Sequence, residues 1–174
     1  MYNLVAVLVL GCVSFAELKP QGSVSNGVGH YWRDYQGYAP SDALPVGPNI
    51  YIGQVFANGI RKPAYIDQQK KYAVFVQNGQ VYSTRDQIKI FCSTDPSQFE
   101  WVKTDTSNIG NVLPNRFPIY GGQLQNNQPL FIGRSHDNQI VGMVVVNSES
   151  DGLHYPLNGH AALAEEFDVF VYKN

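Results

Sequence analysis

The sequence has few cysteines, little charge of either sign and no very long hydrophobic run. It contains two cysteines in 174 residues. Cys12 lies in an apolar N-terminal stretch, so Cys92 is left without an internal disulfide partner. Twelve Lys and Arg side chains against 14 Asp and Glu side chains give a net charge of −2. Phosphate binding needs clustered cations, so nucleic acid is excluded as an expected partner.

The longest apolar stretch, residues 4–15, is shorter than the roughly 20 residues that a membrane-spanning helix takes, and no integral membrane span is expected. The small residues Ser14 and Ala16 suit the positions before a signal-peptidase site. The sequence therefore predicts a signal peptide over 1–16 and a flexible lead-in over 17–30. A buried N-terminal strand is the alternative. We expect a secreted protein or, as a second possibility, one kept in intracellular secretory vesicles.

Short motifs recur along the chain at a separation of about 80 residues, which is the mark of a duplicated unit. The paired landmarks are Trp32 and Trp101, Gly53 and Gly133, and Asn78-Gly79 and Asn158-Gly159. The second copy has a longer segment between its Trp and its Gly, which we assign to a polar loop around 120–128. The landmarks predict two repeats, 31–93 and 99–173, joined by the turn-forming residues 93–97.

Each copy has the pattern of β-strands. Residues 72–76 and 81–84 flank an Asn-Gly pair, which favours a two-residue hairpin turn. Residues 141–146 form a continuous apolar run, typical of a strand covered on both faces. Only 160–166 has helical character. We expect an all-β fold in which the two repeats form two pseudo-twofold-related antiparallel sheets packed on each other.

Residue types typical of enzyme active sites occur in the sequence, but not in the spacing that catalysis requires, so we expect no enzyme. Ser135, His136 and Asp137 are of the triad residue types, but neighbours along a strand or turn point apart and form no relay. His154 and His160 match no dependable zinc spacing. No phosphate-cradling glycine loop is present. We therefore expect no catalytic residues, no metal site and no cofactor.

Aromatic side chains gather at the head of the first copy, over 31–38. They suit packing at the repeat junction or, alternatively, a binding surface. Trp32 and Trp101 are interpreted as core anchors rather than ligand platforms. His30 is expected to be exposed. Cys92 follows a strand-like apolar run and is interpreted as a buried, inert thiol, although it could also pair two chains.

The order and spacing of several segments resemble the DM9 repeat family over nearly the whole predicted mature chain. In the second copy the segments are Trp101, 118–122, 130–136, 141–144, 155–159 and 166–170. In the more divergent first copy they are Trp32, 50–53 and 63–66. The resemblance implies a tandem all-β pair of repeats, often dimeric. Such proteins occur in insects, molluscs and fish, including insect secretory tissue such as the salivary gland, and several are calcium-independent, mannose-binding lectins of innate immunity.

The resemblance also implies where a sugar would bind. In sugar-binding members an Asp after a Gly-Gly and a Lys in a Pro-Gly-Lys turn hold vicinal hydroxyl groups. Here the Asp position falls near Leu124 and the Lys position falls on Met143 or, in the first copy, on Tyr65, so neither charge is kept. The polar neighbours either rebuild a different sugar site or are solvated loop residues. The candidate ligand-binding residues are Lys62, Tyr65, Gln123, Leu124, Gln125, Asn126 and Met143.

Two functions remain as hypotheses. The first is a secreted, non-enzymatic recognition protein that binds glycans or microbial surfaces in innate immunity or the response to infection. The alternative is a protein-interaction or vesicle-associated DM9 module without sugar binding. A homodimer is compatible with both. As a lectin the protein would need two repeats or a dimer for avidity, and as an interaction module it could pair two chains through Cys92.

Overall fold

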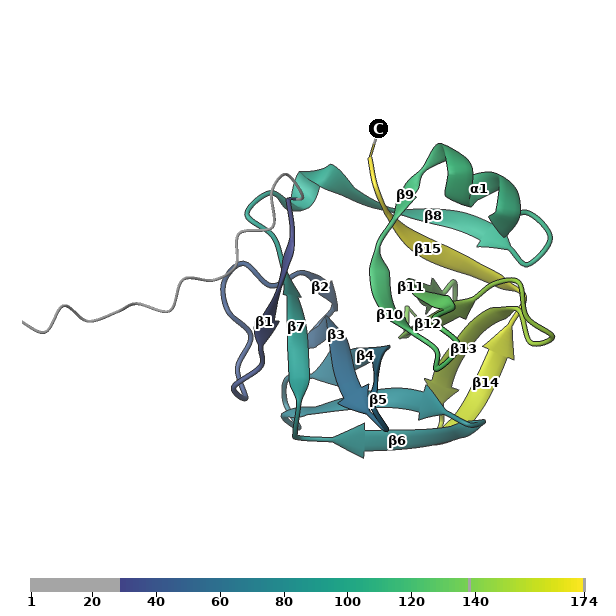
Figure 1. Cartoon of the computed structure of the whole chain (residues 1–174). Coiled ribbons are helices and arrows are strands. Elements are labelled where there is room, and N and C mark those ends of the chain that lie inside the picture. The colour runs from purple at the N-terminus through teal and green to yellow at the C-terminus, as the bar shows by residue number, and fades with distance from the viewer. Residues whose placement is uncertain (1–28, 138, 174) are drawn as a thin grey trace, which may run out of the picture.

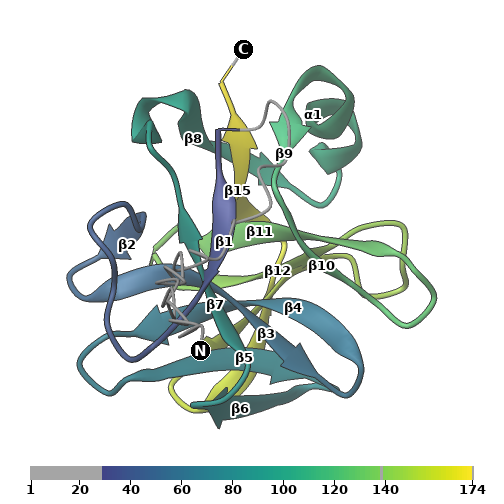
Figure 2. The same ribbon diagram turned by 60° about the vertical axis from the view of Figure 1, so that its left-hand side comes forward.

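The computed structural model describes residues 29–137 and 139–173, so the predicted signal peptide and most of the predicted lead-in lie outside the described residues. The described chain is almost entirely β-structure, arranged as two antiparallel sheets (Figures 1 and 2). The strands of the first sheet are β1 (Tyr31–Asp34), β2 (Pro45–Gly47), β3 (Ile50–Ala57), β4 (Ile60–Asp67), β5 (Tyr72–Gln77), β6 (Gln80–Thr84) and β7 (Ile88–Cys92). Those of the second are β8 (Phe99–Asp105), β9 (Phe117–Pro118), β10 (Tyr120–Gln123), β11 (Pro129–Ser135), β12 (Val141–Val145), β13 (Gly152–Leu157), β14 (His160–Ala164) and β15 (Glu166–Tyr172). A 3-10 turn, η1 (Pro96–Gln98), joins the sheets, and a short helix, α1 (Ile109–Asn115), follows β8.

The two sheets have the same strand order. The first runs β1-β7-β3-β4-β5-β6 and the second runs β8-β15-β11-β12-β13-β14, with β2 and β10 each added beside β3 or β11. The tryptophans occupy matching places, because Trp32 pairs with Phe91 and Trp101 pairs with Phe170. The last strand, β15, stays in its own sheet. The predicted all-β fold with two packed antiparallel sheets is confirmed.

The hairpins form where the sequence places Asn-Gly. Asn58, Asn78 and Asn158 have φ values of 51°, 50° and 51°, and each is followed by a glycine that also has positive φ. Asn and Gly enter this left-handed region at low cost, and two such residues in succession make the turn whose twist matches the flanking strands. Each turn therefore sets the register of the hairpin that it closes.

The sheets meet through an apolar cluster to which both contribute. Ile52 and Phe91 from the first sheet pack with Ile132 and Phe170 from the second. Trp32 and Trp101 pack half-buried against the same cluster, which supports their interpretation as core residues. Each sheet also has an apolar cluster of its own.

The structure corrects three expectations. Residues 160–164 form β14 rather than a helix, because they pair along their whole length with β13. Part of the extra length of the second copy is the helix α1, not only the polar loop. His30 is half-buried rather than exposed: its ring stacks on Phe91 at 4.8 Å between centroids, and it hydrogen-bonds with the Tyr172 hydroxyl.

Candidate functional site

A cavity of about 350 Å³ lies between the two sheets at the turn ends of the β3–β4 and β5–β6 hairpins. We call it the Lys62 cavity. Its lining residues come from the β3–β4 turn, from β4, from the end of β5 and from the loop after β10. They are Asn58, Ile60, Lys62, Gln77, Asn78, Leu124, Gln125 and Asn126.

The cavity exists because β4 and β5 separate. Their pairing runs from Asp67–Tyr72 to Tyr65–Val74 and goes no further. Continued in the same register, it would bring Lys62 opposite Gln77. Instead β10 crosses β4 at this end, so close that a side chain on Gly122 would meet the Arg61 carbonyl oxygen. The loop after β10 then closes the gap with its own residues.

Lys62 is the one ionisable side chain in the lining. The residue is only 4% exposed. Within the described chain its ammonium has no carboxylate partner and no hydrogen bond, and burial alone lowers the pKa of Lys62 below its usual value. The Lys62 ammonium is not among the fully buried polar atoms that lack a partner, so it reaches the cavity and is available to a ligand.

Gln77 supplies the complementary chemistry. It is 8% exposed, and its side-chain oxygen has no hydrogen-bond partner among the described residues. The remaining amides, Asn58, Asn78, Gln125 and Asn126, stand on the rim, where two of them are held by the Asn-Gly turns. Carboxamides both donate and accept, so the cavity offers mixed hydrogen bonding around one cation.

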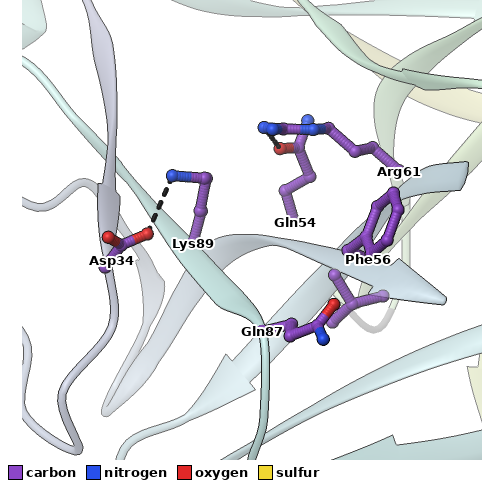
Figure 3. Close-up of a pocket in the computed structure, with 7 residues that line it drawn as sticks. Asp34, Gln54, Phe56, Arg61, Gln87 and Lys89 are labelled. Atoms are coloured by element: carbon purple, nitrogen blue, oxygen red, sulfur yellow. Dashed lines mark hydrogen bonds and ion pairs between the residues drawn. The ribbon is translucent and has the colours of Figure 1, made fainter. Parts of the chain in front are cut away.

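Two other hollows on the surface lack an unpartnered cation of this kind. The hollow of about 290 Å³ in Figure 3 contains Asp34 and Lys89, joined at 2.8 Å, and Arg61, which donates to the Gln54 side-chain oxygen at 3.1 Å. Gln54 in turn donates to the Gly121 carbonyl at 2.9 Å. The charged groups of this hollow are thus already satisfied by the protein.

A third hollow, of about 450 Å³, adjoins it and shares Gln54, Phe56 and Arg61 with it. Its other lining residues include Trp32 and Tyr120. Phe56 is 49% exposed and Tyr120 is 61% exposed, so this surface presents aromatic rings beside one cation, Arg61.

The structure gathers four of the seven candidate residues from the sequence, Lys62, Leu124, Gln125 and Asn126, around the one cavity. The remaining three lie elsewhere. Gln123 lines the aromatic hollow. Tyr65 packs half-buried against the cluster between the sheets. Met143 is buried in an apolar cluster against which Leu124 packs, so the positions that match the family's Asp and Lys now belong to apolar packing.

Sequence analysis missed Gln77, Asn58 and Asn78. The Asn-Gly pairs marked both turns, and counting back from them would have put Gln77 opposite Lys62. The separation of β4 from β5 could not be predicted from the sequence, because it depends on where β10 crosses β4.

The second sheet has different residues at the corresponding places. Met143 pairs with Ile132 as Tyr65 pairs with Ile52, so Lys62 corresponds to Ile140. Gln77, just before its Asn-Gly turn, corresponds to Leu157. Ile140 and Leu157 are half-buried and pack against the apolar cluster of the second sheet.

Other chemistry is weakly represented in the described residues. They contain no group of three or more His, Cys, Asp or Glu side chains placed to hold a metal ion. Ser135 accepts from the Ile140 amide at 3.1 Å, and His136 lies 3.2 Å from Asp168, so the predicted absence of a relay among the three adjacent residues agrees with the contacts. Cys92 is fully buried, and burial raises the pKa of its thiol to about 12. None of the described helices has the length and apolar character needed to span a bilayer.

Comparisons with known proteins agree with the all-β fold. A family model described as DM9 repeat matches residues 45–163. Among solved structures, the chain is similar to the nematode sperm cell motility protein MFP2B, with a TM-score of 0.55 and 11% sequence identity. The similarity covers 83% of this chain and 44% of that protein, so this chain spans less than half of MFP2B. At this identity the likeness concerns the fold alone. No curated protein matches.

Proposed function

Because the chain belongs to the DM9 repeat family, we propose that it is a non-enzymatic recognition protein that binds carbohydrate through the Lys62 cavity. The family and the fold support a binding module rather than an enzyme. The observation that carries the proposal is a pair of polar groups without protein partners in the lining of one cavity, the Lys62 ammonium and the buried Gln77 side-chain oxygen.

Buried polar groups in proteins are almost always hydrogen-bonded, so two unpartnered groups at one cavity point to a ligand that completes them. Sugars present hydroxyl groups that both donate and accept. Five of the eight lining side chains are carboxamides, which pair with such groups in either direction. A volume of about 350 Å³ is at the lower end of the range for ligand sites, which suits one sugar ring.

A glycan array probed with the purified protein tests the proposal. The protein should bind a defined set of glycans, and the double variant Lys62→Ile with Gln77→Leu should lose that binding while remaining folded. Lys103→Ile is the matched control, because it also removes one cation but from an exposed position on β8. Binding by the double variant at the wild-type level, or no binding by the wild type to any glycan, would refute the proposal.

A single cavity gives weak binding. A site with millimolar affinity supplies only about 4 kcal/mol, so capture of a microbial surface would need several linked sites. Since the second sheet has Ile140 and Leu157 at the corresponding places, the second site would come from a second chain. We therefore propose a homodimer, which light scattering after gel filtration would detect as twice the mass of the mature chain.

Secretion is part of the same proposal and rests on the sequence. The expected mature protein begins at Glu17, after cleavage behind Ala16. N-terminal sequencing of protein recovered from the culture medium of expressing cells checks this. Protein found only inside the cells and still starting at Met1 would contradict it.

The second candidate function is a protein-interaction module that has lost sugar binding. It is favoured by the packing of Leu124 against the apolar cluster of Met143 and by the exposed rings of Phe56 and Tyr120 in the aromatic hollow. Replacing both rings by Ala separates the two functions. Glycan binding through the Lys62 cavity survives this change, whereas a protein partner docked on the hollow is lost.

A further inference from the structure

The lining of the Lys62 cavity has one positive charge and no negative charge. Its eight residues include no Asp and no Glu. The residue next to Lys62, Arg61, is a second cation whose side chain bonds to the neutral Gln54 amide rather than to a carboxylate. Arg61 lines the two other hollows, so Lys62 is the one charge in the lining of this cavity.

The cavity cannot bind two neighbouring hydroxyl groups in the way that an Asp–Lys pair does. That mode needs a carboxylate to accept and an ammonium to donate hydrogen bonds, and the lining supplies only the ammonium. An anionic group on the ligand would instead pair with Lys62 directly. The complex would then hold a matched pair of charges in place of a lone ammonium.

We propose that the ligand of the Lys62 cavity is an acidic sugar, of the uronic acid class, whose carboxylate accepts from the Lys62 ammonium while its hydroxyl groups bond with Gln77 and the amides on the rim. This inference rests on the proposed function and names its ligand class. The lowered pKa of Lys62 agrees with it, since an anion in the cavity would restore the charged form.

The test uses two sugars that differ at one carbon, methyl β-glucuronide and methyl β-glucoside, titrated into the full mature chain by calorimetry. The glucuronide should bind at least about tenfold more tightly, the effect of one hydrogen bond to a charged group. Lys62→Ile should remove that preference, and Lys62→Arg should keep it because the charge remains. Lys103→Ile should leave both affinities unchanged. Thermal unfolding of each variant checks that it is folded.

The outcomes separate this inference from the proposed function. Equal affinity for the two sugars, lost in Lys62→Ile, overturns the acidic ligand but leaves carbohydrate binding in the cavity intact. A preference for the glucuronide that persists in Lys62→Ile overturns the role of Lys62. If neither these sugars nor uronic acid oligosaccharides bind, while neutral glycans bind on the array, the acidic ligand is again refuted. If nothing binds at all, both proposals fall.

Discussion

At the open ends of β4 and β5 in the first sheet, Lys62 and Gln77 face a cavity, whereas the corresponding places in the second sheet hold Ile140 and Leu157 packed in an apolar cluster. The two sheets share one strand order, so the same scaffold accepts either pair. Hydrophobic residues at these places are compatible with the fold. The polar pair in the first sheet therefore needs a reason other than folding, and ligand binding provides one.

A second contrast lies beside the two tryptophans. In the second sheet Arg134 pairs with the buried Asp168 at 2.9 Å and lies over the Trp101 ring at 4.5 Å. At the matching places the first sheet has Gln54 and Lys89, and Lys89 pairs instead with the exposed Asp34. At these matching places the second sheet pairs its charges internally, whereas the first sheet pairs Lys89 with an exposed carboxylate.

The largest expected effect on the free energy of unfolding comes from a glycine substitution in β10, compared with the same substitution in its counterpart β2. Gly122 and Gly47 occupy matching places, opposite Leu130 and Ile50. A Cβ on Gly122 would lie 1.9 Å from the Arg61 carbonyl oxygen, whereas one on Gly47 would meet nothing within 4 Å. Gly122→Ala should lower the free energy of unfolding by about 3 kcal/mol or more, because backbone must shift. Gly47→Ala should change it by less than about 1 kcal/mol. Urea unfolding measures both, and equal losses would show that β10 does not press on β4.

The next effect concerns the ion pairs. Arg134→Met leaves the buried Asp168 carboxylate with only His136, and the free energy of unfolding should fall by about 2 kcal/mol. Asp34→Ala breaks the pair with Lys89, in which the Asp34 side chain is 78% exposed, and should cost less than about 1 kcal/mol. Chemical denaturation distinguishes the two costs. If Asp34→Ala proved the more damaging, the contrast between the sheets would be wrong.

A smaller, opposite effect follows from copying the second sheet into the first. Lys62→Ile with Gln77→Leu replaces an unpartnered cation and amide by the residues that the fold already accepts elsewhere. In the absence of ligand the free energy of unfolding should rise by about 1–2 kcal/mol, because the variant no longer holds polar side chains without hydrogen-bond partners at this place. A loss of stability would instead mean that Lys62 and Gln77 serve the fold.

The smallest effect is a pH dependence. Cys92, fully buried, corresponds to Val171 in the second sheet. Burial raises the pKa of the Cys92 thiol to about 12 in the folded state. In the unfolded chain the thiol has its ordinary, lower pKa, so at a pH between the two values only the folded state keeps the proton. Stability then falls as pH rises from about 9 toward 12. Between pH 8 and 10, Cys92→Val should reduce that fall by about 1 kcal/mol. An identical pH profile in urea unfolding would refute the assignment.

Much of the fold was predictable because its signals are local. Asn-Gly pairs marked the hairpins, and the recurrence of Trp, Gly and Asn-Gly marked the duplication. The predicted helix over residues 160–164 was wrong. Alanine and leucine favour helices in isolation, but pairing with β13 overrides that preference.

The candidate site was predictable in part. Lys62 and the loop residues Leu124, Gln125 and Asn126 were found by matching positions to the family, and they do meet. Gln77 was not found, because its role depends on a gap that opens only when β10 crosses β4. Local sequence fixes neither that crossing nor the burial that leaves Lys62 without a partner.

The crystal structure of the protein with the glycan that it binds most tightly tests the central claim most directly. We predict electron density for the sugar in the Lys62 cavity, with ligand oxygens within hydrogen-bond distance of Lys62 Nζ and of the Gln77 side chain. A sugar seated instead in the hollow of Figure 3, or against the second sheet, would contradict the assignment of binding to this cavity.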